Sequence, residues 1–298
     1  MQQHDQRSHT SRERPCRSEA WLRTSVLSSA ALVLALTVAA PASWAQEEPE
    51  WSELRALIEI NATDGDAGLQ FKIDGDDWVS ANIRDPNGKK IYSVQGGGSV
   101  SEQGLTENFF ESAEPSCDEE GASLTDVLTR FPADAYEITG KSTENDFLGG
   151  EAVLTHALPA VPVGLEATNG NSVTLNWVWP AEENEDPDLG ECPDEDDIAD
   201  LLVDDADLFG FQIVVIREDP EPQLEFVVEL GATAEAVDIP DGFIEPNTEY
   251  KWEVVAIGAG IDPEDPNAEL DPELKGNQTI AESLFCTDGS GDAGDCAE

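Results

Sequence analysis

Basic side chains are scarce in this sequence. Its 298 residues include 15 Lys and Arg against 64 Asp and Glu, which gives a formal net charge of −49. Such an excess of carboxylates repels nucleic acids and anionic lipids, and favours cations or basic partners. Because salt screens charges beyond about 8 Å, a solvated surface suited to salty surroundings is the simplest explanation, and specific cation binding is the alternative.

Long apolar runs are also rare. The only candidate, residues 26–40, follows five arginines and precedes the small residues Ser43 and Ala45. This is the pattern of a secretory signal peptide over residues 1–45, and no later run approaches the roughly 20 apolar residues of a membrane span. We therefore expect a secreted or periplasmic protein with no membrane span after cleavage. Residues 46–298 contain 10 Lys and Arg against 61 Asp and Glu, a net charge of −51.

Histidine and cysteine are too few for several chemistries. His156 is the only histidine after residue 45, and no two cysteines have the CxxC spacing. Almost no residues are therefore left for a zinc finger, haem attachment or Cys/His catalysis. An even number of cysteines in an exported chain predicts disulfides, and four cysteines allow three pairings. The short separation of Cys286 and Cys296 favours a bridge between them, with Cys117 and Cys192 as the other two cysteines.

Residues 46–158 have the pattern of a mainly antiparallel β-sandwich domain with one or two short helices. Short runs of β-forming residues alternate with turn signals such as the DPNG of residues 85–88, which predicts a hairpin. Helical spacing appears in residues 105–114 and again in residues 123–131, where Ser123 and Asp126 resemble a capping box. The expected strands cover residues 57–62, 69–74, 78–84, 89–95, 135–141 and 151–158.

A Pro-rich segment, residues 159–164, has the composition of a linker between domains. The chain that follows carries SVTLNW, ending at Trp177, and IEPNTEY, ending at Tyr250. In this order the two motifs resemble the core tryptophan and the corner tyrosine of a fibronectin type III domain. The resemblance implies a second antiparallel β-sandwich over residues 165–288, and such modules serve mostly as spacers or binding platforms.

The predicted second domain departs from that family in its loops. Residues 181–207 form a long insertion with fourteen acidic residues and no basic one, and residues 258–276 form a second acidic connection. The family's fold places these two loops at the same pole, so one end of the domain is expected to be strongly negative. Residues 289–298 have the composition of an acidic flexible tail.

The first domain has a resemblance of its own. It carries EINATDGDAG, DPNG, EQGLTENFFESAEP, RFP and LTH in this order, and so is similar to a family of uncharacterised secreted bacterial proteins. That resemblance supports fold and export, and it implies no activity.

One stretch of the first domain suggests a cation site. If residues 57–62 and 69–74 pair as a hairpin, two groups of polar residues flank neighbouring turns and could converge on Ca²⁺. No placement of the glycines fits an EF-hand loop, and Asp-Gly pairs are also preferred tight-turn residues, so turns without a cation are the simpler explanation. The candidate ligands are Asn61, Asp64, Asp66, Asp74, Asp76 and Asp77.

The sequence contains few of the motifs that indicate catalysis. There is no G-x-S-x-G elbow for a triad with His156 and no phosphate-binding glycine loop. Trp51, Trp78 or Trp179 could line a carbohydrate-binding face, although packing in a core or at its rim is the simpler role. The favoured function is a secreted, non-catalytic binding or adhesion module whose ligand is a protein or carbohydrate at or outside the cell. Its acidic surface is a candidate for a response to divalent cations. The alternative is a polysaccharide hydrolase that uses two carboxylates, or its accessory carbohydrate-binding protein.

Overall fold

The computed structural model describes residues 50–114, 123–170, 172–179, 207–219, 221–263, 269–294 and 296. The predicted signal peptide, Cys117, Cys192 and nearly all of the acidic insertion 181–207 lie outside the described residues. Among the helices that are described, none has the length and hydropathy to cross a lipid bilayer.

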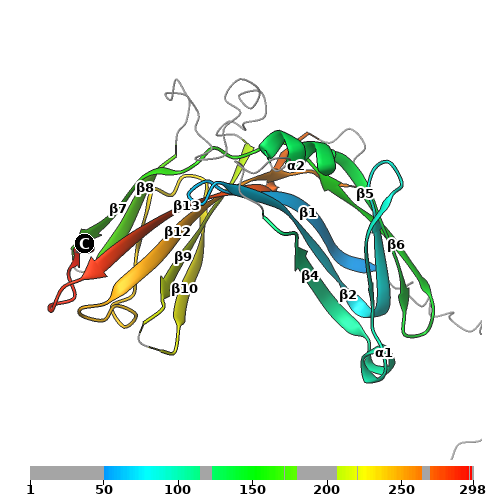
Figure 1. The fold of residues 1–298 in the computed structure, drawn as a ribbon, viewed down its shortest axis with the longest axis horizontal. Helices are drawn as coiled ribbons and strands as arrows, with labels where there is room; N and C mark the ends of the chain where they lie inside the picture. Colours follow the sequence, from blue (N-terminus) through cyan, green and yellow to red (C-terminus); the bar gives the residue numbers. More distant parts are fainter. Residues whose placement is uncertain are drawn as a thin grey trace, which may run out of the picture. The chain divides into compact units, whose positions relative to one another are not determined.

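Strands make up most of the described chain (Figure 1). One sheet has the order β10-β9-β12-β13-β1-β2-β5-β6, with β3 and β4 paired to β2 and β14 paired to β13, and the other has the order β11-β8-β7. The mainly β fold class expected from the sequence is confirmed. The strands are β1 (Trp51–Asn61), β2 (Asp66–Arg84), β3 (Lys90–Gln95), β4 (Leu105–Glu111), β5 (Asp134–Ser142), β6 (Phe147–Leu154), β7 (Val163–Asn169), β8 (Val173–Val178), β9 (Leu208–Arg217), β10 (Leu224–Gly231), β11 (Ala236–Asp238), β12 (Glu249–Gly260), β13 (Asp271–Thr287) and β14 (Ala293–Gly294).

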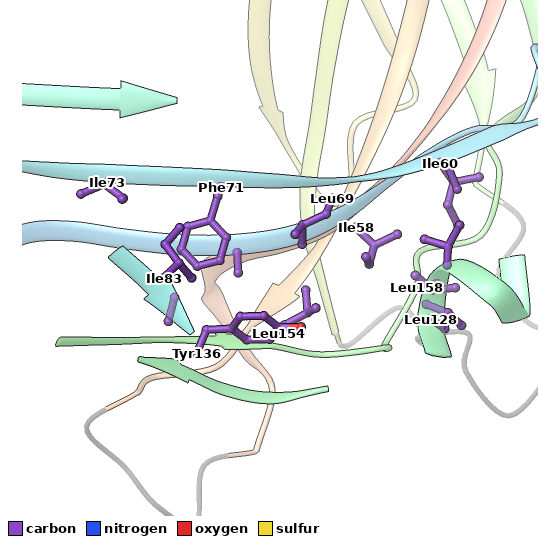
Figure 2. Packing of buried hydrophobic residues seen from close by; sticks show 14 of the residues in the cluster. Ile58, Ile60, Leu69, Phe71, Ile73, Ile83, Leu128, Tyr136, Leu154 and Leu158 are labelled. Carbon is purple, nitrogen blue, oxygen red and sulfur yellow. The ribbon is translucent and has the colours of Figure 1, made fainter. Parts of the chain in front are cut away.

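The long strand β2 contributes to both layers of the first sandwich. Its first half pairs with β1 and β4, and its second half pairs with β3 and β5. The pairing shifts between Asp74 and Trp78, where Asp77 adopts a positive φ of 53°. Figure 2 shows Ile58 and Phe71 in the same cluster as Tyr136 and Leu154, which come from β5 and β6. This apolar cluster is the first hydrophobic core.

The two helical predictions for this domain had different outcomes. Helix α2 (Leu124–Arg130) is confirmed, and its Asp126 N–H donates to the Ser123 hydroxyl at 3.2 Å. The helix predicted over residues 105–114 is wrong, because Leu105–Glu111 forms strand β4. Pairing with β2 overrides the helical spacing, since it stacks Phe110 on Phe71 at 5.8 Å between ring centroids. A short helix, α1 (Ser99–Gln103), was not predicted.

The second sandwich has the strand arrangement that the fibronectin type III resemblance implied. Strands β10, β9, β12 and β13 form one layer, and β11, β8 and β7 form the other. Trp177 is buried between them, 5.5 Å from the ring of Phe211. A second hydrophobic core, centred on Trp177, Tyr250 and Trp252, therefore fills this sandwich.

Tyr250 forms the corner expected from the sequence. Its hydroxyl accepts the Glu245 N–H at 2.7 Å and donates to the Phe243 carbonyl at 3.2 Å. We expect Tyr250→Phe to lower the free energy of unfolding by about 1–2 kcal/mol, because a backbone N–H loses its partner. In urea denaturation the control Tyr92→Phe, which removes one partly exposed hydrogen bond to Asn108, should cost less than half as much. Equal losses for the two variants would contradict this role of the corner.

The predicted linker is not a free connection. Leu158, Ala160 and Val161 are buried, and the Pro159 carbonyl accepts the Thr279 hydroxyl at 2.7 Å. Strands β1 and β13 also pair in parallel, with Glu59 opposite Gln278, so the large sheet continues from one sandwich into the other. The Pro-rich composition of residues 159–164 predicted a linker, but the apolar residues between the two prolines, Ala160 and Val161, are buried.

The predicted flexible tail is also ordered in part. Ala293 and Gly294 pair with β13, and Cys296 forms a disulfide with Cys286. The favoured pairing of these two cysteines is confirmed. The Asn169 side chain, which accepts the Ala293 N–H, ties the segment to the second sandwich.

Candidate functional site

One face of the large sheet lies outside both hydrophobic cores. On each strand the side chains of this face alternate with those of the cores, and the pairing aligns them from β10 to β4. We call it the outer face. It carries the carboxylates Glu53, Glu59, Asp66, Asp74, Glu107, Glu111, Glu225, Glu229, Glu253 and Glu282, against the basic side chains of Arg55, Lys72 and Lys251, and Lys275 forms an ion pair with Glu229.

Apolar side chains lie among these charges. Leu284 is 55% exposed, Phe109 is 52% exposed and Val227 is 50% exposed. Leu284 lies opposite Lys251 on β12, and Val227 lies opposite Val214 on β9. Large exposed apolar groups surrounded by charge are typical of interaction surfaces. The part of the outer face on β9, β10, β12 and β13 thus combines contact area with negative charge.

An acidic cluster occupies the middle of the outer face. Oxygen atoms of Glu59, Glu111 and Glu114 all lie within 4.8 Å of one another. Glu59 is only 9% exposed, and the Gln278 amide donates to its Oε2 atom. The Gln70 amide donates to Glu111 at 2.9 Å. The cluster therefore holds three carboxyl groups at the place where β1, β2, β4 and β13 meet.

A glycine makes this close packing possible. Gly68 lies opposite Glu59 on β2, and a Cβ atom there would lie 2.6 Å from the Glu114 side chain. Ser112 holds the segment after β4 in place, because its N–H donates to the Leu69 carbonyl at 2.8 Å and its hydroxyl accepts the Leu69 N–H at 2.9 Å. This segment brings Glu114 over the strand and helps to bury Glu59.

Burial and mutual repulsion raise the pKa values of carboxyl groups in the acidic cluster. Burial, followed by the charges of Glu114 and Glu111, raises the pKa of Glu59 to about 8. Burial and the charges of Glu111 and Asp66 raise the pKa of Glu114 to about 7. The cluster therefore retains protons near neutral pH, because three adjacent carboxylates cannot all ionise without a compensating charge. A proton or a divalent cation can supply that charge.

The structure separates the six residues of the predicted calcium site. Residues 57–62 and 69–74 do pair as a hairpin, with Asn61 opposite Asp66. Asp74, however, lies opposite Glu53, eight residues along β2 from Asp66 and so about 27 Å away in an extended strand. Asp76 and Asp77 lie beyond Asp74, at the bend of β2. The six residues do not converge, because the two groups flank opposite ends of one hairpin.

The predicted ligands at the hairpin turn, Asn61, Asp64 and Asp66, lie near the acidic cluster. The Asn61 amide donates to Asp64 at 3.2 Å and to Glu282 at 2.8 Å. The buried Asp66 Oδ1 has no hydrogen-bond partner among the described residues. Burial, followed by the charges of Asp64, Glu282 and Glu111, raises the pKa of Asp66. Asp66 is thus the one predicted ligand that interacts directly with the cluster.

Glu59, Glu111 and Glu114 were not among the site residues predicted from the sequence. A glutamate within the apolar run LIEINA was a signal for Glu59, since a carboxylate in such a strand requires special surroundings. Glu111 and Glu114 gave no comparable signal, because they were assigned to a helix rather than to a strand and the segment after it.

The aromatic and histidine candidates have structural roles. Trp78 is fully buried, and Trp51 packs against its edge at 5.8 Å between ring centroids. Trp179 packs against Phe211 at 5.9 Å. The His156 Nε2 atom lies 2.8 Å from the Phe131 carbonyl oxygen, with which it can hydrogen-bond. Trp78 is therefore unable to present a surface to a sugar.

The larger surface cavities lie away from the acidic cluster. A cavity of about 440 Å³ is bordered by Arg55, Lys72 and Lys275, and one of about 540 Å³ is bordered by Trp51 and Glu151. A third, of about 220 Å³, lies beside Asn169 and Asp292. None of these three cavities in the described part of the chain is lined by Glu59, Glu111 or Glu114.

The comparisons found similar solved structures only. No family model matches the chain, and no curated protein matches it. The chicken CNTN1 FN1–FN3 domains are 11% identical, with 81% of this chain and 66% of that chain covered and a TM-score of 0.30. A two-domain fibronectin type III segment of chicken tenascin is 9% identical, with 81% and 100% covered and a TM-score of 0.25. A cytokine receptor complex is 10% identical, with 78% and 96% covered and a TM-score of 0.25. At these TM-scores the likeness bears on neither ligand nor activity.

Proposed function

We propose that this chain is an exported, non-catalytic binding or adhesion module whose outer face takes a cationic protein ligand. The observation that supports the proposal most strongly is the placement of Val227 and Leu284, each at least half exposed, among the carboxylates of β10, β12 and β13. Burying such apolar groups supplies affinity, and the carboxylates select a partner of positive charge.

A random peptide library displayed on phage tests the proposal. Panned against residues 46–298 at physiological salt, it should yield peptides that combine Lys or Arg with apolar residues. Leu284→Glu should weaken their binding at least tenfold, because it places a charge in the contact and removes an apolar side chain. The measurement is the dissociation constant of the selected peptides by fluorescence anisotropy.

The matched control is Phe147→Glu. Phe147 is 71% exposed, but it lies on β6 in the other layer of the first sandwich. Its substitution should leave peptide binding unchanged. No enrichment of basic peptides, or binding that depends on Phe147 rather than on Leu284, would overturn the proposal.

The proposal includes a response to divalent cations at the acidic cluster. Glu59, Glu111 and Glu114 offer the carboxylate oxygens that Ca²⁺ prefers, and the unpartnered Oδ1 of Asp66 belongs to a carboxyl group coupled to theirs. At pH 8, millimolar Ca²⁺ should raise the melting temperature of the parent chain and leave Glu59→Gln unchanged. An equal rise in both, or none in the parent, would remove the cation from the proposal.

A hydrolase is the rival function. Carboxyl groups with raised pKa values at close distance can act as acid and nucleophile in glycoside hydrolysis, and the acidic cluster meets that condition. None of the three cavities described above is lined by a residue of the cluster, and this observation favours the binding module over the hydrolase. Turnover of any member of a polysaccharide panel that is abolished by Glu59→Gln would favour the hydrolase.

A further inference from the structure

Strand β10 is an end strand of the large sheet. All eight of its residues pair with β9 on one side. On the other side, no strand of the described chain pairs with it, and its one further backbone hydrogen bond in that part of the chain is at its end, where the Gly231 carbonyl accepts the Ala234 N–H at 3.0 Å. The unpaired N–H and carbonyl groups of such an edge can pair with an added strand.

The edge lacks most of the features that usually protect it. Natural edge strands are blocked by lysine, proline, bulges, inward-pointing charges or short length. Strand β10 has eight residues, contains neither lysine nor proline, and pairs with β9 without a register shift. Its inward side chains, Phe226, Val228 and Leu230, are apolar and pack on the second core. It is therefore straight enough and long enough to receive a partner strand.

The charges on β10 select the partner. On its outer face the exposed Val227 lies between Glu225 and Glu229, and Glu229 also forms an ion pair with Lys275 of the same chain. If two copies of the chain paired antiparallel about Val227, Glu225 of each would lie opposite Glu229 of the other. Like charges directly opposite destabilise a strand pair, so self-pairing in this register is disfavoured. A partner strand that carries Lys or Arg opposite Glu225 and Glu229 is instead stabilised, because opposite charges then face each other.

From this we infer that an extended segment of a partner protein pairs with the edge of β10 as a further strand. The partner segment carries basic residues two positions before and two positions after an apolar residue. The inference rests on the proposed function, because it specifies how a cationic protein ligand binds at the β10 side of the outer face. Backbone hydrogen bonds supply affinity in this mode, and the alternating side chains supply specificity.

A short synthetic peptide tests the inference. The probe is the acetylated and amidated peptide Thr-Thr-Lys-Thr-Val-Thr-Lys-Thr-Thr, compared with the same peptide carrying Glu in place of both Lys. The Lys peptide should bind residues 46–298 at least tenfold more tightly than the Glu peptide. The double variant Glu225→Lys/Glu229→Lys should reverse this preference. If the double variant fails to fold, Glu225→Lys alone should reduce the preference at least threefold.

Backbone methylation separates strand addition from contact with the face. An added strand pairs through only one of its two edges, so N-methylation of one alternate set of peptide residues should abolish binding and methylation of the other set should not. Equal effects of the two methylated peptides, no binding of the Lys peptide, or a preference that survives charge reversal on β10 would overturn the inference. If any of these three results is obtained while the binding of library peptides is still weakened by Leu284→Glu, strand addition is wrong and the proposed function stands.

Discussion

Glu59→Gln should make the protein several kcal/mol more stable than the parent chain above pH 8, with almost no difference below pH 4. The parent carries a carboxyl group at position 59 that is 9% exposed and whose pKa is raised from 4.5 to about 8. Glutamine is neutral at every pH and can still accept the amide hydrogen of Gln278. The substitution therefore removes the cost of ionising a buried acid.

The sign of the pH dependence follows from proton binding. Between pH 4.5 and pH 8 the folded state retains a proton on Glu59 that the unfolded state releases. The contribution of Glu59 to the free energy of unfolding is fully present below pH 4.5. As the pH rises from 4.5 to 8, this contribution is lost at about 1.4 kcal/mol per pH unit. The full loss is about 3–5 kcal/mol by the same relation. Glu114, whose pKa is raised to about 7, acts in the same direction.

Urea denaturation at several pH values measures this effect. The control is Glu151→Gln, the same substitution at an exposed carboxylate on β6. It should leave the slope of unfolding free energy against pH close to that of the parent. A slope that Glu59→Gln does not flatten would show that the acidic cluster ionises normally.

Asn277→Ala should destabilise the protein by about 3 kcal/mol. The side chain of Asn277 is 1% exposed and lies on β13 where the sandwiches join. Its oxygen accepts the Ile58 N–H at 2.7 Å. Its amide donates to the Thr155 and Ala157 carbonyls at 3.0 and 2.9 Å. Alanine leaves these buried backbone groups without partners, and each unpaired group costs about 1–3 kcal/mol.

A second asparagine provides the control for this prediction. Asn176 on β8 donates to the Glu166 carbonyl and the Thr168 hydroxyl, but its hydrogen bonds are exposed or only partly buried. Water can replace them, so Asn176→Ala should cost less than 1 kcal/mol in urea denaturation. If the two variants lost equal stability, Asn277 would not have the special role in the junction that its contacts indicate.

Local patterns in the sequence predicted much of the fold. The DPNG turn, the capped helix at Leu124–Arg130 and the motifs around Trp177 and Tyr250 each depend on neighbouring residues, and each has its expected structure. The helix predicted over residues 105–114 was wrong because a strand partner, rather than local spacing, determines its structure. The parallel pairing of β1 with β13 joins residues 219 positions apart, and no local signal indicates it.

The candidate site was less predictable for the same reason. The predicted calcium ligands were chosen by closeness in sequence, but an antiparallel hairpin separates Asp66 from Asp74. The acidic cluster instead joins Glu59 to Glu111 and Glu114, about fifty residues later, through the register of β1, β2 and β4. Val227 and Leu284 likewise share the outer face only through the pairing of β9 and β12 between their strands.

The most direct test of the proposed function is a hydrogen–deuterium exchange footprint of residues 46–298 with a basic peptide selected from the library. If the outer face is the binding surface, the peptide should slow exchange in β9, β10, β12 and β13, and the effect should vanish in Leu284→Glu. Protection that falls on β7, β8 and β11, in the opposite layer of the second sandwich, would contradict the account.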